Sequence, residues 1–302
     1  MRRLDLKIGF ACNNRCDFCA QGDKRRSVAR LTFRQIVGEL KTAAQQGVRG
    51  VVFTGGEPTL HPHLLEAVAA AKTLGYRSIQ VQTNGRRFAY LDFCRALKEA
   101  GANEFSPSLH GSTPAVHDGQ THSPGAWKQV VRGIENMRRL GLFVLTNSVV
   151  TRRNYKDLPE LARLLVRLEV DQMQFAFVHI VGTAAVKARE VVPRKSDAMP
   201  YIKEGLRVGR AGGVRCYTEA IPYCLLAGFD DCAAERVIPD GIIVDSNIRV
   251  EHWERYRTQE GKAKRRECGT CRYDAVCEGP WREYPEMYGW DEFAPVAEAP
   301  VA

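Results

Sequence analysis

Residues 4–19 read LDLKIGFACNNRCDFC, an apolar run that leads directly into three cysteines. Cys12, Cys16 and Cys19 have the spacing C-x3-C-x2-C, so three thiolates can reach one compact metal centre from a single loop. Soft thiolates select iron–sulfur clusters or zinc. A 4Fe-4S cluster takes four ligands, and three cysteines would leave one iron open to a small molecule. A zinc site would need a further ligand, and no histidine lies near this loop in the sequence. The spacing therefore favours iron–sulfur over zinc.

Strand-like and helix-like segments alternate along the first 210 residues. We expect strands over residues 4–10, 50–54, 78–82, 104–109, 142–150 and 172–179. Amphipathic segments predict helices over residues 32–46, 61–74, 90–100, 126–140, 158–168 and 198–210. Thr32 and Gln35 have the spacing of a capping box. Helix C-caps are predicted at Gly47, Gly75, Gly101 and Gly141. Six strand–helix units predict an α/β fold, a partial (β/α)6 TIM-like barrel.

The unusual motifs of the sequence all follow predicted strands. In parallel α/β barrels the functional groups lie on loops at the carboxyl ends of the strands. Here the cysteine loop follows the first strand, GGEP at 55–58 follows the second, and TNG at 83–85 follows the third. The fourth strand runs into SLHG at 108–111. The sequence therefore predicts one site on one rim of the barrel, which scattered loop residues would not give.

These motifs, in this order, resemble those of the radical S-adenosylmethionine (radical SAM) superfamily, and the similarity covers about the first 210 residues. The resemblance implies that Cys12, Cys16 and Cys19 hold a 4Fe-4S cluster. The open iron would be chelated by the amino and carboxylate groups of S-adenosylmethionine. An electron would then cleave the sulfonium to methionine and a 5′-deoxyadenosyl radical, which abstracts hydrogen from a substrate. The expected electron donor is a reductase, a flavodoxin or a ferredoxin.

The resemblance also implies cofactor contacts outside the cysteines. The aromatic ring before the third cysteine would pack near adenine, GGEP would receive the methionyl amino group, and the serine of SLHG would face the ribose or carboxylate. Glycines permit close approach of backbone carbonyls, and a glutamate adds acceptor charge opposite an ammonium group. The predicted cofactor-binding residues are Phe18, Gly55, Gly56, Glu57, Thr83, Asn84, Ser108 and Asn147. The family often has Asp where this chain has His110.

Several further side chains are weighed for function. His179 ends the sixth predicted strand, and it is the candidate for substrate contact or proton transfer, with a structural histidine as the alternative. His117 and His122 are expected in a polar loop, and Cys94 is expected as a buried side chain within a helix. Aromatic residues expected to pack the C-terminal part are Trp281, Tyr284, Tyr288 and Trp290.

The last third of the chain carries its own cysteine pattern. Cys268, Cys271 and Cys277 form C-x2-C-x5-C, which resembles the SPASM and twitch extensions that carry auxiliary 4Fe-4S clusters. The resemblance implies one auxiliary cluster, and a zinc ribbon is the alternative. Cys224 is the favoured fourth ligand, because Pro222 stiffens the turn before it. The alternative is that Cys216 and Cys232 are both ligands, in which case Cys277 would be spare. We expect a barrel domain over residues 1–210 and a cluster-binding extension over 211–302.

Composition limits the class of protein. The 302 residues include ten cysteines and are 44% hydrophobic, with a net charge of +9. The N-terminus has neither a signal peptide nor a spanning segment, so we expect a soluble, cytoplasmic protein without a membrane partner. Clustered cysteines in that compartment predict metal ligands rather than disulfides. The basic charge suits an acidic partner, but no recognition motif predicts a nucleic-acid substrate.

Three functions follow from these observations. The first is a radical SAM enzyme that modifies a peptide or a biosynthetic small molecule. The second is a radical SAM enzyme that modifies RNA, which only the charge favours. The third is a non-enzymatic iron–sulfur or zinc protein for electron transfer or binding. Since the cluster motif starts at residue 12, we expect no N-terminal leader-binding domain before it, and a peptide would be recognised directly or through a partner protein.

Overall fold

The strands form one open sheet. The computed structural model describes residues 2–297, and its sheet has nine strands in the order β7-β6-β5-β4-β3-β2-β1-β8-β9. All neighbours are parallel except β8 and β9. The strands are β1 Arg3–Gly9, β2 Gly50–Gly55, β3 Ser78–Thr83, β4 Glu104–Pro107, β5 Phe143–Val150, β6 Gln172–Phe177, β7 Arg215–Glu219, β8 Gly241–Val244 and β9 Arg249–Val250. This arrangement confirms the predicted partial TIM-like barrel.

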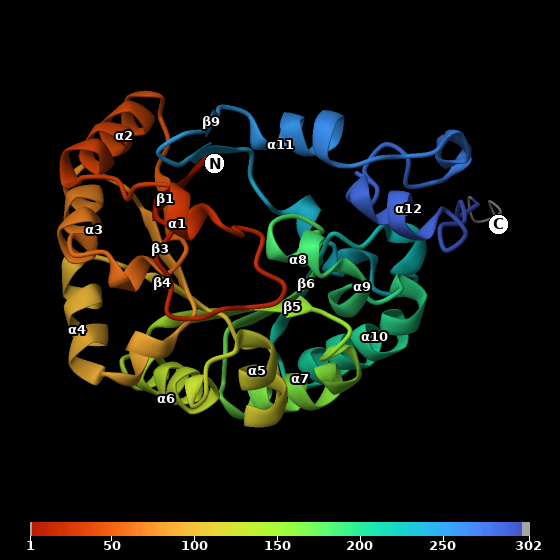
Figure 1. The fold of residues 1–302 in the computed structure, drawn as a ribbon, viewed down its shortest axis with the longest axis horizontal. Coiled ribbons are helices and arrows are strands. Elements are labelled where there is room, and N and C mark those ends of the chain that lie inside the picture. The colour runs from red at the N-terminus through yellow and green to blue at the C-terminus, as the bar shows by residue number, and fades with distance from the viewer. Residues whose placement is uncertain (1, 298–302) are drawn as a thin grey trace.

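Helices surround the strands, as Figure 1 shows for α2, α3, α4, α6, α7 and α10. The helices are α1 Lys24–Ser27, α2 Phe33–Gln45, α3 Leu64–Thr73, α4 Leu91–Ala100, α5 Pro114–Thr121, α6 Ala126–Arg139, α7 Leu158–Arg167, α8 Thr183–Val186, α9 Ala188–Val191, α10 Lys195–Ala211, α11 Trp253–Tyr256 and α12 Glu283–Tyr288. Each long helix turns its apolar side toward the sheet, and this burial supplies the main stabilisation of the fold.

The six predicted strands and six predicted helices are present, with boundaries shifted by a few residues. The capping box of α2 forms: the Thr32 side chain accepts from the Gln35 backbone N–H, and the Gln35 side chain accepts from the Thr32 N–H. Gly47, Gly75, Gly101 and Gly141 have the positive φ expected after helix ends. Cys94 is fully buried on α4, as predicted.

The last third of the chain extends the sheet at both edges, which the sequence did not predict. β7 pairs with β6, and β8 pairs with β1 from Arg3↔Gly241 to Leu6↔Val244. The strands β7 and β8 are only five and four residues long, so neither appears in the sequence as a long apolar run. The predicted division at residue 210 stays a prediction, and residues 298–302 of the predicted extension lie outside the described residues.

Helix α5 corrects one expectation. The segment expected to be a polar loop begins with Thr113 as N-cap, whose side chain accepts from the Val116 N–H, and Pro114 occupies the first turn. His117 lies on this helix and is fully buried, while His122 ends it in a left-handed conformation. Within residues 2–297, no helix is both long and apolar enough to cross a membrane.

Candidate functional site

The three N-terminal cysteines line one large cavity at the carboxyl ends of the strands. Cys12, Cys16 and Cys19 follow β1, and their loop borders one open cavity together with the ends of β2 to β7. All three thiols are free and partly buried. The backbone N–H of Asn14 points at the Sγ of Cys12 at 3.4 Å. The predicted rim and the predicted clustering of motifs there are therefore observed.

The chemistry of these thiols fits a metal cluster. Burial raises the pKa of Cys12 and, more strongly, that of Cys16, and each nearby thiolate raises the pKa further. Thiols in such a place do not ionise readily by themselves. The positive charge of iron would offset this cost, because metal coordination deprotonates a thiol. A loop with three soft donors and one open side suits a 4Fe-4S cluster with an accessible iron.

Helix α5 supports the cysteine loop from outside. The backbone N–H of Arg15 donates to the Thr121 carbonyl at 2.9 Å, and the N–H of Asp17 donates to the Gln120 carbonyl at 3.1 Å. The Asp17 carboxylate pairs with His122 Nε2 at 2.8 Å and with Lys187 Nζ at 2.5 Å. Sequence reasoning missed this support, because α5 itself was not recognised.

The glycines of GGEP are required by packing against the first strand. A Cβ at Gly55 would lie 2.2 Å from the Gly9 carbonyl oxygen, and one at Gly56 would lie 2.3 Å from that of Phe10. The backbone N–H of Gly56 donates to the Gly9 carbonyl at 2.9 Å, and that of Glu57 donates to the Ala11 carbonyl at 2.8 Å. The two glycines thus fix the start of the cysteine loop, in addition to lining the cavity.

The Glu57 side chain joins GGEP to TNG. It is buried, and its Oε1 accepts from the Thr59 N–H at 3.0 Å, the Thr59 hydroxyl at 2.6 Å and the Thr83 hydroxyl at 2.6 Å. Its Oε2 accepts from the Asn84 N–H at 2.7 Å. The predicted contact of this carboxylate with an ammonium group stays a prediction. What the structure displays is a carboxylate that holds two strand-end loops in register.

The other predicted cofactor residues lie on the cavity wall: Phe18, Thr83, Asn84, Ser108 and Asn147. The Oδ1 of Asn147 is buried without a hydrogen-bond partner among the described residues, so it is available to a ligand. The Phe18 ring stands edge-on to the His110 ring, with 4.6 Å between the ring centroids. Burial keeps the pKa of His110 well below its usual value, and its Nδ1 accepts from the Val149 N–H at 3.1 Å. His110 is therefore a neutral wall residue.

The far wall of the same cavity comes from β6, β7 and the C-terminal part of the chain. His179 lies there, as predicted, and its ring stacks on Trp281 with 3.9 Å between centroids and 10° between planes. Its Nε2 lies 3.7 Å from the Glu283 carboxylate. Trp281 was expected to pack the C-terminal part, and it also lines this cavity with Trp253 and Glu219. No periodic pattern in the sequence predicts this wall.

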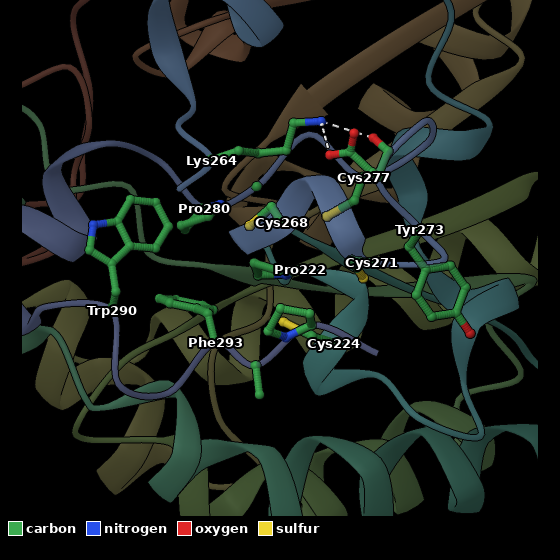
Figure 2. A pocket seen from close by; sticks show the side chains of 14 residues that line it. Pro222, Cys224, Lys264, Cys268, Cys271, Tyr273, Cys277, Pro280, Trp290 and Phe293 are labelled. Atoms are coloured by element: carbon green, nitrogen blue, oxygen red, sulfur yellow. Dashed lines mark hydrogen bonds and ion pairs between the residues drawn. The ribbon is translucent and has the colours of Figure 1, made fainter. Parts of the chain in front are cut away.

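The C-terminal cysteines form a second site, shown in Figure 2. Cys224, Cys268, Cys271 and Cys277 line one cavity of about 420 Å³. Its remaining wall is mostly apolar, with Pro222, Pro280, Trp290 and Phe293 among its members. Burial raises the pKa of Cys224 to about 12, and the three other thiols of the site raise it as well. Four partly buried thiols on one cavity fit a metal centre that would compensate their charge as thiolates.

Cys216 and Cys232 lie elsewhere. Both are buried, and Cys216 donates its S–H to the Val214 carbonyl at 3.2 Å. The Arg210 guanidinium lies 3.0 Å from the Cys232 Sγ. Burial and, after it, the neighbouring Cys232 raise the pKa of Cys216, and neither cysteine lines the second cavity. Within residues 2–297, no three His, Cys, Asp or Glu side chains are arranged to hold a single metal ion.

Comparison with known proteins assigns the family. The sequence profile described as the radical SAM superfamily matches residues 6–165, from β1 to α7. This chain belongs to the radical SAM superfamily. It is a radical SAM iron–sulfur enzyme, so the non-enzymatic alternative does not apply. The family implies a 4Fe-4S cluster and S-adenosylmethionine, while the far wall and the second cysteine site lie outside the matched region.

Curated relatives of this radical SAM enzyme include two proteins described as "Probable GTP 3′,8-cyclase". The one from Saccharolobus solfataricus is 32% identical over 243 residues, which are 80% of this chain and 72% of that protein. The one from Sulfolobus acidocaldarius is 31% identical over 180 residues, which are 59% of this chain and 56% of that protein. This chain therefore spans between about half and three quarters of these relatives.

Solved structures share the fold. Streptococcus suis SuiB bound to S-adenosylmethionine has a TM-score of 0.66 at 15% identity, with 92% of this chain and 72% of that chain covered. The enzyme anSMEcpe with bound AdoMet and Cp18Cys peptide also has a TM-score of 0.66 at 15% identity, with 93% and 88% covered. At this identity the likeness concerns the fold alone. It extends over the C-terminal third of this radical SAM enzyme as well as the barrel.

Proposed function

We propose that this enzyme cleaves S-adenosylmethionine reductively and uses the 5′-deoxyadenosyl radical to abstract hydrogen from a small molecule or peptide. One observation carries the proposal: the three cysteines, the polar strand-end residues and the wall of His179, Trp281 and Glu219 all line one cavity. The cysteines would hold the cluster, and the far wall would hold the substrate.

The chain's own residues would position the cofactor. The backbone of Gly55 and Gly56 would receive the methionyl amino group, with the Glu57 carboxylate holding that loop in place. The buried Oδ1 of Asn147, which has no hydrogen-bond partner within residues 2–297, would accept from a donor of the cofactor, and Ser108 lies on the same wall. Phe18 would pack near adenine. When bound, the reduced cluster supplies the electron that breaks the sulfonium bond.

We further propose one auxiliary 4Fe-4S cluster on Cys224, Cys268, Cys271 and Cys277. The four thiols border the same cavity, whereas Cys216 and Cys232 do not. Ligation by four cysteines would leave no iron open to substrate, so this cluster would serve electron transfer or the local fold. An external reductase, flavodoxin or ferredoxin would supply the electrons. A zinc site would bind one metal ion here in place of about four irons.

A second candidate is the cyclisation of GTP, which the names of the curated relatives favour. Both candidates share the first step, and they differ in the substrate. The test is anaerobic incubation of reconstituted enzyme with dithionite and S-adenosylmethionine, with and without GTP. Formation of 5′-deoxyadenosine supports radical initiation, and its absence from enzyme with a full complement of iron contradicts it. Consumption of GTP together with 5′-deoxyadenosine would favour the second candidate.

A further inference from the structure

The far wall of the cavity carries a carboxylate that the cofactor site does not use. Glu219 is the last residue of β7, and it lines the same cavity as the three cysteines. Its Oε2 accepts from the Gln174 side-chain amide at 2.7 Å. Among residues 2–297, no hydrogen bond or ion pair involves its Oε1. One oxygen of this carboxylate is therefore held by Gln174, and the other has no hydrogen-bond partner among the described residues.

The cations near Glu219 are engaged by other carboxylates. Lys262 Nζ lies 2.7 Å from Glu235 and 2.8 Å from Glu278, and its side chain is 1% exposed. Arg257 makes two hydrogen bonds of 2.6 Å to Glu278. These two cations thus pair with Glu235 and Glu278, and within residues 2–297 neither forms an ion pair with Glu219.

Glu219 has no ion-pair partner among residues 2–297. Lys262, Arg257 and His179 each lower its pKa, but each of them contacts another carboxylate. Lys195, which is buried beside this wall, donates to the Ala220 carbonyl at 2.8 Å. A partly buried carboxylate without a direct partner would be stabilised by a bound cation.

We propose that Glu219 binds a protonated amine or guanidinium group of the substrate, an inference that rests on the proposed function. The free Oε1 would accept the charge-assisted hydrogen bond, while Gln174 holds the carboxylate in place. Trp281 and Trp253 line the same cavity, and aromatic faces add to the attraction for a cation. The cationic group is either that of a small amine or that of a lysine or arginine side chain in a peptide.

The electrostatics of this wall agree with this assignment. Burial raises the pKa of Glu219 above its usual value, and the neighbouring Glu235 raises it further. A bound cation would offset both effects. An anionic group would find fewer positively charged partners on this wall. The cavity-lining residues include one arginine, Arg25, and its guanidinium donates to the Asn14 carbonyl in the cysteine loop at 3.2 Å.

The experiment uses the reconstituted holoenzyme with S-adenosylmethionine bound. Binding is measured by calorimetry for N-acetyl-lysine amide and N-acetyl-arginine amide, for short peptides with a central lysine, and for GTP. The neutral counterparts carry an acetylated lysine amine or citrulline in place of arginine. We expect the cationic probes to bind at least about tenfold more tightly than their neutral counterparts. A preference limited to the peptides would assign the cation to a peptide, and an equal preference would assign it to a small amine.

Variants then assign the preference to Glu219. Glu219→Gln should lose the tenfold preference, while Glu219→Asp should retain part of it because the charge remains. The control is Glu104→Gln, a part-buried glutamate at the opposite end of the barrel, which should behave as wild type. Iron content and circular dichroism check that each variant is folded.

Two results would overturn the inference: cationic and neutral probes that bind alike up to about 10 mM, or a preference that Glu219→Gln retains. The wild-type formation of 5′-deoxyadenosine without any probe tests the proposed function separately. Normal formation of 5′-deoxyadenosine without tighter binding of the cationic probes would refute the proposed role of Glu219 and leave the proposed function standing.

Discussion

The two cysteine sites of this molecule are assembled in different ways. In the first, Cys12, Cys16 and Cys19 come from one loop behind one strand. In the second, Cys268, Cys271 and Cys277 come from one segment, but Cys224 belongs to a loop more than forty residues earlier, after β7. A local motif can be read from its spacing. The position of a distant ligand depends on the tertiary fold, so the sequence alone left Cys216, Cys224 and Cys232 as candidates for that ligand.

The largest effect is expected at the first site. Cys16→Ala should abolish formation of 5′-deoxyadenosine and reduce iron from about eight to about four per chain, because two thiols hold a cubane poorly. The matched control is Cys94→Ala, since Cys94 is equally a cysteine but lies buried on α4, where its S–H donates to the Phe88 carbonyl. It should lose some stability and retain iron and activity. Activity near wild type in Cys16→Ala would refute the assignment.

The second site gives a test of the distant ligand. In a background with Cys12, Cys16 and Cys19 changed to Ala, the protein should bind about four irons with negligible zinc. Cys224→Ala should then lose this cluster, whereas Cys216→Ala and Cys232→Ala should keep it, because neither lines the cavity. Iron, zinc and electron paramagnetic resonance spectra are measured. Loss with the latter two variants and retention with Cys224→Ala would reverse the assignment.

Sequence reasoning predicted the parts of the molecule that depend on short-range patterns. The barrel units follow from apolar periodicity, and the cysteine loop, GGEP and TNG follow from strand-end placement. It missed α5, whose burial of His117 is not visible in a polar segment, and it missed β7 and β8, which are five and four residues long. The wall with Glu219 and Trp281 brings together distant segments, and only tertiary contacts define it.

A third test concerns the close approach behind the first site. Gly56→Ala would place a Cβ 2.3 Å from the Phe10 carbonyl oxygen and 2.6 Å from that of Ala11, so the cysteine loop must move. We expect a loss of about 3 kcal/mol in the free energy of unfolding, together with lower iron content, because overpacking against backbone has no flexible relief. The measurement is anaerobic urea unfolding combined with iron analysis.

The control for this test is Gly38→Ala in the middle of α2. A Cβ there meets no atom within 4 Å, and the backbone is helical. Alanine should therefore raise the free energy of unfolding by about 0.5–1 kcal/mol through helix propensity alone. If the two alanine variants changed stability alike, the close packing of GGEP against the first strand would not explain its glycines.

The smallest expected effect is at the contact between the two parts of the chain. Lys24 on α1, just after the cysteine loop, lies 3.1 Å from Asp245, which follows β8. Asp245 Oδ1 also accepts from the Asn247 N–H at 2.8 Å and the Ile248 N–H at 2.9 Å. Burial alone would raise the pKa of Asp245, but these hydrogen bonds and Lys24 lower it below its usual value.

Because the folded-state pKa of Asp245 is lowered, its contribution is complete above the unfolded pKa of about 3.9 and is lost only as the pH falls through the folded value. Asp245→Asn should cost about 1 kcal/mol in the free energy of unfolding, since the ion pair is part-exposed and neutral amide oxygens accept more weakly. The cost should be equal at about pH 8 and about pH 6 in urea unfolding. Asp92→Asn, at an exposed pair with Arg95 on α4, should cost almost nothing. A cost for Asp245→Asn that vanished by about pH 6 would mean that the carboxylate titrates far above its lowered pKa, and that the contact does not join the two parts through charge.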